Sequence, residues 1–145
     1  VNLVSVYDAP IPGTETVLWD LLLERPPEAN ISHKVMPTWQ QHLDFIESKP
    51  YEAWYLIELS LEITEVGYTY RFIGAIYLTK HDEIGLGILE AWQHQGHGAA
   101  AVHQLKALYL RPRYFANVAP ANLASQQFWL KQGFKPLQVQ YVLDG

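Results

Sequence analysis

Residues 83 to 100 read EIGLGILEAWQHQGHGAA, and this stretch decides how the chain is interpreted. It opens with an apolar run that Gly85 and Gly87 interrupt, which is typical of a strand that another backbone or a ligand approaches closely. A short loop with Gly96 and Gly98 follows and leads into helical spacing. Such a loop turns backbone N–H groups inward at the positive end of a helix dipole, which predicts a cradle for an anion such as a pyrophosphate. A glycine pair alone also fits a plain turn between strand and helix.

Outward from this stretch, hydrophobic periodicity and turn residues predict alternating strands and helices. Strands are expected at 2 to 7, 53 to 63, 68 to 79, 83 to 89, 114 to 119 and 137 to 143, and helices at 14 to 24, 38 to 48, 98 to 110 and 122 to 132. This order predicts an α/β fold, with one mixed sheet covered by helices on both faces. At 145 residues, a single domain over residues 1–145 is expected.

Composition excludes several classes of function. The net charge is -5 and no cluster of basic residues stands out, so we expect no nucleic-acid partner. Because the chain has no cysteine, thiolate metal sites and a cysteine nucleophile are excluded. The apolar runs fall far short of the ~20 residues that a membrane span needs, and the first residues do not resemble a signal peptide. A cytoplasmic protein without a membrane partner is therefore expected.

A more specific signal lies in the loop itself. Residues 93 to 98, QHQGHG, match the Q/R-x-x-G-x-G/A signature of the GNAT (GCN-related N-acetyltransferase) superfamily. A second register that begins at Gln95 also fits. We prefer the first, because it places Ile88 and Leu89 at the expected end of the strand.

A second motif follows in the correct order. Residues 122 to 125 (NLAS), 128 and 129 (FW) and 133 and 134 (GF) resemble the family's N-x-x-S…LY…GF ending. Together the two motifs and the element order make the chain similar to GNAT enzymes over nearly its whole length. The resemblance implies a mostly antiparallel central sheet with helices on both faces, and strands four and five that splay apart.

The resemblance also implies acetyl-CoA as the acyl donor and a set of residues that bind it. The main chain of strand four would contact the pantetheine arm, backbone amides of the loop would hold the pyrophosphate, and the second motif would bond the arm near its middle. The strand-four residues are Leu86, Ile88 and Leu89. The loop residues are Gln93, His94, Gln95, Gly96, His97, Gly98 and Ala99. The residues of the second motif are Asn122 and Ser125.

For catalysis, the resemblance implies direct attack of an amine on the thioester, with a strand-four amide stabilising the oxyanion. Glu83 is the candidate general base, because it begins strand four, and a solvated strand-end carboxylate is the alternative. The usual tyrosine acid of the family is replaced by Trp129, whose indole is not a useful proton donor. Tyr114 and Tyr141 are candidate substitutes, and nothing in the sequence selects either.

The histidines suggest an acceptor contact rather than a metal. His94 and His97 lie three residues apart in the loop, without a carboxylate or thiolate to complete a ligand set with them or with His103, so we expect no metal. His33 lies in the connection that borders the acceptor site in this family, where it would face the acceptor or remain a surface residue.

These observations predict an N-acetyltransferase that acts on a primary amine of a small molecule, with amino sugars among the candidate acceptors. Two alternatives stay open. One is acetylation of a protein N-terminus or lysine, and the other is a non-catalytic domain that binds acyl-CoA. The sequence also leaves open whether the chain forms a homodimer.

Overall fold

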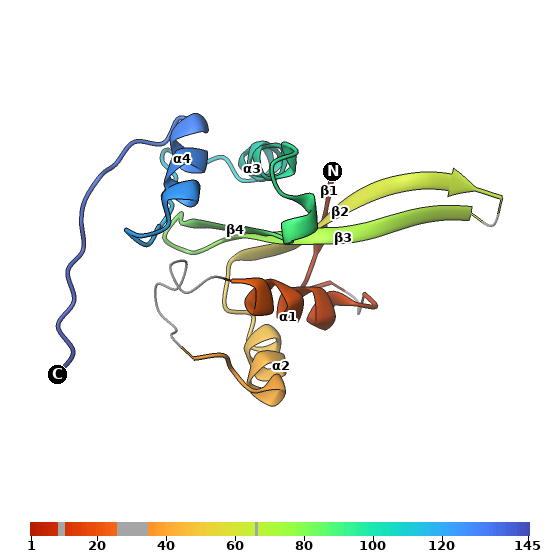
Figure 1. Cartoon of the computed structure of the whole chain (residues 1–145), viewed down its shortest axis with the longest axis horizontal. Helices are drawn as coiled ribbons and strands as arrows, with labels where there is room; N and C mark the ends of the chain where they lie inside the picture. Colours follow the sequence, from red (N-terminus) through yellow and green to blue (C-terminus); the bar gives the residue numbers. More distant parts are fainter. Residues whose placement is uncertain (9–10, 26–34, 66) are drawn as a thin grey trace.

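The computed structural model describes residues 1–8, 11–25, 35–65 and 67–145 (Figure 1). Its elements are β1 (Asn2–Ser5), α1 (Thr14–Glu24), α2 (Trp39–Glu47), β2 (Ala53–Thr64), β3 (Gly67–Leu78), β4 (Ile84–Ile88), a short 3-10 helix η2 (Glu90–Trp92), α3 (His97–Leu108) and α4 (Leu123–Lys131).

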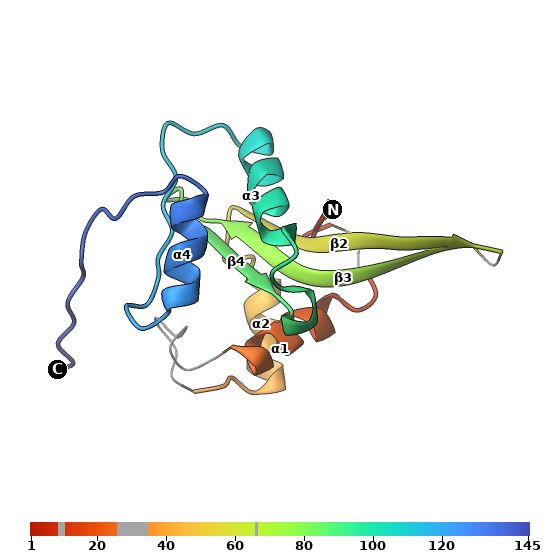
Figure 2. The ribbon, with the colours of Figure 1, turned by 45° about the horizontal axis from the view of Figure 1, so that its top comes forward.

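The four strands form one antiparallel sheet in the order β1-β2-β3-β4, with β4 at an edge. Helices α1 and α2 cover one face of the sheet, and α3 and α4 lie over the other, which confirms the predicted α/β architecture (Figure 1). The long β2–β3 hairpin extends beyond the helices at one end of the molecule (Figures 1 and 2).

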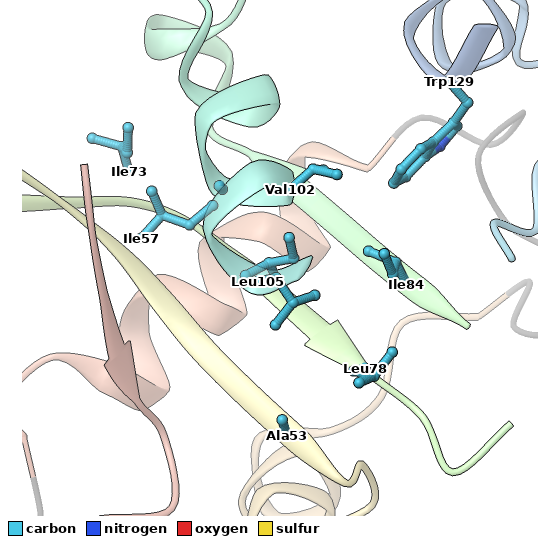
Figure 3. Close-up of a cluster of buried hydrophobic side chains, with 10 residues drawn as sticks. Ala53, Ile57, Ile73, Leu78, Ile84, Val102, Leu105 and Trp129 are labelled. Carbon is cyan, nitrogen blue, oxygen red and sulfur yellow. The ribbon is translucent and has the colours of Figure 1, made fainter. Parts of the chain in front are cut away.

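Each face of the sheet buries its own apolar cluster, as the alternation of side chains along a strand requires. Under α3 and α4, Ile84 and Ile57 pack with Val102, Leu105 and Trp129 (Figure 3). Under α1 and α2, a second cluster gathers around Leu18, Trp54, Leu56, Phe72 and Ala75. The cluster under α3 and α4 includes Ile84 of β4, with Leu86 and Ile88 packed against it, so it fixes β4 against these helices.

Local signals placed the helices accurately. Thr38 caps α2 as predicted, since its hydroxyl accepts from the Gln41 N–H at 3.1 Å and the Gln41 side chain accepts from the Thr38 N–H at 2.9 Å. Such a capping box satisfies donors that the first helical turn would otherwise leave without partners.

Two predicted strands are not formed. The strand expected at 114 to 119 is reduced to one parallel bridge between Phe115 and Glu83. The prediction of a strand at 137 to 143 was wrong, because this segment pairs with no part of the chain that the structure describes and runs away from the body (Figures 1 and 2). Alternating side chains favour an extended backbone, whereas a strand also needs a neighbouring edge.

Candidate coenzyme-binding and catalytic site

The hydrogen-bond phase of β4 decides which of its main-chain groups are free. At one end the Thr79 N–H donates to the Glu83 carbonyl at 2.9 Å, and at the other the Leu89 N–H donates to the Ile73 carbonyl at 2.8 Å. In an antiparallel strand, every second residue forms its main-chain hydrogen bonds with the same neighbouring strand. The main-chain groups of Gly85 and Gly87, which lie between Glu83 and Leu89, therefore also point toward β3. The even-numbered residues therefore direct their main-chain groups away from the sheet.

The first outward-facing residue is still paired. The Ile84 N–H donates to the Phe115 carbonyl at 2.8 Å, and the Phe115 N–H donates to the Asp82 carbonyl at 2.9 Å. The strand has no further bridge to a following segment beyond this point in the described residues. The main-chain groups of Leu86 and the N–H of Ile88 thus lie at an edge that has no neighbouring strand in the described residues, and we call it the open edge of β4.

The loop after β4 is shaped by two residues in the left-handed region. After η2, the Gln93 side chain donates to the Ile88 carbonyl at 2.8 Å, which ties the loop to the strand end. His94 has φ 61° and Gly96 has φ 84°. A non-glycine residue in this region is uncommon, and the two together turn the chain sharply into α3.

The start of α3 has backbone donors without partners among the described residues. Gly96 is its N-cap and supplies no side chain, and the first intrahelical bond runs from the Ala100 N–H to the Gly96 carbonyl at 3.1 Å. The N–H groups of His97, Gly98 and Ala99 thus lie in the first turn, where a helix has no partners of its own. Free amides at the positive end of a helix dipole form a site for an anion.

Gly98 has a packing reason to lack a side chain. A Cβ at this buried position would lie 3.1 Å from Leu86 Cδ2 and 3.2 Å from Phe128 Cε1. The glycine therefore lets α3 approach both β4 and α4 closely.

These features share one cavity of about 680 Å³. Its lining includes the predicted coenzyme residues Leu86, Ile88, Gln93, His94, Gly96, His97, Gly98, Ala99 and Ser125, but not Leu89, Gln95 or Asn122. The other lining residues are Trp92, Ala124, Gln127, Phe128, Trp129, Lys131 and Gln132. Of these, Ala124, Phe128 and Trp129 belong to the second motif but had no expected coenzyme contact, and sequence reasoning missed the rest. Lys131 is a cation suited to bind phosphate. The sequence could have identified it, because it lies in the last turn of the helix that the second motif begins.

The comparison with protein families agrees with this geometry. Residues 17–134 match the acetyltransferase (GNAT) family. The chain belongs to the GNAT family. A search among curated proteins gave no match. As a GNAT domain, the chain is an acetyltransferase in general terms, and none of its described helices is long and apolar enough to cross a membrane.

The GNAT motif asparagine, Asn122, is the N-cap of α4. Its side-chain oxygen accepts from the Ser125 N–H at 3.2 Å, while Ser125 itself lines the cavity. The side chain is thus engaged in the cap, and it positions the helix turn that faces the 680 Å³ cavity.

Trp129, which stands where GNAT enzymes usually have a tyrosine, is a core residue with 7% exposure. Its ring packs against Phe128, with centroids 5.0 Å apart, and against Phe134, with centroids 4.8 Å apart. The indole therefore supports the attachment of α4 to the sheet (Figure 3).

Glu83 lies just before β4, where the strand is still paired, and it forms the parallel bridge with Phe115. Its carboxylate accepts from the Thr79 hydroxyl at 3.1 Å and from the Asn117 side-chain amide. It also lines a second cavity of about 330 Å³, together with His81, Phe115, Asn117, Leu137 and Gln138. The two hydrogen bonds thus fix the Glu83 carboxylate at the wall of this cavity.

The two tyrosines considered as substitute acids line neither of the two cavities. The Tyr114 hydroxyl donates to the Tyr109 carbonyl at 2.5 Å and accepts from the Arg111 N–H at 3.1 Å. Tyr141 is 89% exposed on the segment that leaves the body. His33 lies outside the described residues. In those residues no three His, Cys, Asp or Glu side chains are grouped to hold a metal.

Proposed function

We propose that the chain is an acetyl-CoA-dependent N-acetyltransferase that acetylates a primary amine of a small molecule by direct attack. The observation that carries this proposal is the course of the 680 Å³ cavity, which runs from the open edge of β4 to the bare N-terminus of α3. The pantetheine arm carries amide groups and fits an unpaired strand edge, and its pyrophosphate fits free helix amides. Lys131 would add a charge partner for the phosphates.

The acyl-transfer step would use the outward-facing amide of Leu86. This N–H is the first on the open edge beyond the pairing of Ile84 with Phe115. A fixed donor at this place would polarise the thioester carbonyl and stabilise the negative charge of the tetrahedral intermediate. The chain contains no cysteine, and the direct attack needs no covalent enzyme intermediate.

Glu83 would act as general base, through water, on the protonated amine. Its cavity of about 330 Å³ lies at the lower end of the usual range for small-molecule sites, which favours a small acceptor. A carboxylate also suits a cationic amine. Amino sugars are the first acceptor class to test, and a protein N-terminus or lysine is the second.

The test is a free-thiol release assay with acetyl-CoA over amino sugars, polyamines, amino acids and peptides. Glu83→Gln is expected to lower kcat/KM by about 10²- to 10⁴-fold, the usual contribution of a general base, while acetyl-CoA binding stays unchanged. The matched control is Glu47→Gln, at an exposed site on α2.

Three outcomes would contradict parts of the proposal. Coenzyme binding without turnover of any acceptor would favour a non-catalytic acyl-CoA-binding domain. Turnover of peptides alone would favour protein acetylation. Full activity in Glu83→Gln would leave that residue a solvated carboxylate at a strand end.

The proposal also comprises a single domain over residues 1–145, a cytoplasmic location, and no metal, nucleic-acid or membrane partner. Light scattering with size-exclusion chromatography distinguishes a monomer from a homodimer.

A further inference from the structure

A second hydroxyl group lies over β4, on the face covered by α1 and α2. Tyr77 of β3 pairs with Gly85 of β4. A Cβ built on Gly85 would lie 1.9 Å from Cζ and 2.4 Å from the hydroxyl oxygen of Tyr77. The hydroxyl end of the Tyr77 ring therefore occupies the space that a side chain at position 85 would fill, and only a glycine there permits this approach.

This contact places the hydroxyl where the open edge begins. Gly85 lies between Ile84, whose N–H is still paired with Phe115, and Leu86, whose N–H is free. The Tyr77 hydroxyl thus lies over the residue that precedes Leu86, whose amide is proposed to bind the thioester carbonyl. Tyr77 is half-buried.

The ring is held rigidly. Tyr51 stacks on Tyr77 with ring centroids 3.8 Å apart and planes 3° from parallel. Tyr51 is fixed in turn, because its N–H donates to the Tyr7 hydroxyl and its carbonyl accepts from that hydroxyl, both at 2.9 Å. Trp54 packs edge-on against Tyr51 at 5.0 Å. A donor positioned in this way needs little reorganisation during a reaction.

The surroundings of Tyr77 keep its hydroxyl protonated near neutral pH. Burial raises the pKa of Tyr77 above 10, the positive charge of Arg25 and the neighbouring Tyr51 hydroxyl partly oppose this, and the Glu83 carboxylate adds to the rise in pKa.

We propose that Tyr77 is the general acid that protonates the departing thiolate of coenzyme A, a role that Trp129 cannot fill. The inference rests on the proposed function. The amine nitrogen bonds to the thioester carbon, the C–S bond breaks with its electron pair on sulfur, and the Tyr77 hydroxyl proton moves to that sulfur. The amine's proton leaves through Glu83 and water, and water returns a proton to the phenolate. The positive charge of Arg25, which lowers the pKa of Tyr77, would stabilise the transient phenolate.

Tyr77→Phe is the direct test, because it keeps the stacked ring over Gly85 and removes only the hydroxyl. We expect kcat to fall about ten- to hundredfold, the low end for a general acid, since a thiolate with a pKa near ~8.5 is a tolerable leaving group. The dissociation constant of acetyl-CoA and the melting temperature should stay close to wild type. Tyr114→Phe, which removes a hydroxyl remote from the open edge, is the matched control with wild-type kcat.

A second measurement detects the proton itself. Incorporation of 3,5-difluorotyrosine at position 77 makes the phenol more acidic, so a descending limb should enter the pH profile of kcat at lower pH than in the wild type. The same replacement at Tyr114 should leave the profile unchanged.

The outcomes separate this inference from the proposed function. If the wild type turns over no acceptor, the proposed function fails, and the inference fails with it. If the wild type is active and Tyr77→Phe retains its kcat, or if the difluorotyrosine variant shows the wild-type profile, the inference alone is overturned.

Discussion

Replacing Gly98 by glutamate tests whether the N-terminus of α3 is the phosphate site. The new Cβ would lie against Leu86 and Phe128, at 3.1 and 3.2 Å, and both of these residues line the large cavity. The rest of the side chain must then extend into the cavity, where free amides of the first helical turn can bind its carboxylate. We expect this carboxylate to occupy the anion site and to repel the pyrophosphate.

The size of the effect follows from ligand linkage. Acetyl-CoA at a hundred times its dissociation constant stabilises the native state by about 2.7 kcal/mol. With about 2.1 cal/mol/K of unfolding entropy per residue, 145 residues give about 0.3 kcal/mol/K, so the melting temperature should rise by about 9 °C. A hundredfold loss of affinity leaves about 0.4 kcal/mol at the same concentration, or roughly 1 °C.

Differential scanning calorimetry with and without acetyl-CoA measures both values. Gly98→Gln is the matched control, because it has nearly the same bulk as glutamate without the charge. Its coenzyme-induced shift should fall by less than that of Gly98→Glu. A Gly98→Glu variant with native circular dichroism and an undiminished shift would refute the reasoning and place the pyrophosphate elsewhere.

Two further predictions concern the α4 cap and the pH dependence. Asn122→Ala removes the cap to the Ser125 N–H and should cost about 0.5–2 kcal/mol of stability. It should also weaken acetyl-CoA binding in titration calorimetry, and a destabilised variant with wild-type affinity would leave only the capping role. In the wild type, kcat/KM should rise with pH to a plateau without a descending limb below about pH 9, because the amine must lose a proton and burial raises the pKa of Tyr77 above 10. A descending limb that begins near neutral pH would contradict this.

The elements of the fold that could be predicted are those set by neighbours in the sequence. Helix α1 was predicted with its observed bounds, Thr14–Glu24, and the Thr38 cap marked the start of α2. The segment at 137 to 143 also has a clear local pattern, an alternation of apolar and polar side chains, and it still forms no strand. Its alternating side chains specify an extended backbone, whereas pairing depends on an edge elsewhere in the chain, which periodicity does not contain.

In the site too, the locally encoded parts could be predicted, and the parts that depend on distant residues could not. The motif of residues 93 to 98 identified the coenzyme loop, because its backbone geometry is encoded locally by residues such as Gly96. The contact of Asn117 with Glu83 joins residues 34 positions apart. The position of Tyr77 over Gly85 depends on the register between two strands, and a shift of one residue would reverse the face on which each side chain lies. The sequence therefore pointed to tyrosines near the second motif rather than to Tyr77.

The phase of β4 connects the two halves of the proposed mechanism. Even-numbered residues turn their main-chain groups toward the open edge, and their side chains pack with α3 and α4. The side chains of odd-numbered residues point to the opposite face of the sheet. On that face the Glu83 carboxylate contacts Thr79, and the missing side chain of Gly85 leaves room for Tyr77. The coenzyme would thus be bound from the face of α3 and α4, while the proposed base and acid act from the face of α1 and α2. Because the two sets of groups lie on one strand, between Glu83 and Leu86, we expect donor and acceptor to be bound together, as direct transfer of the acetyl group requires.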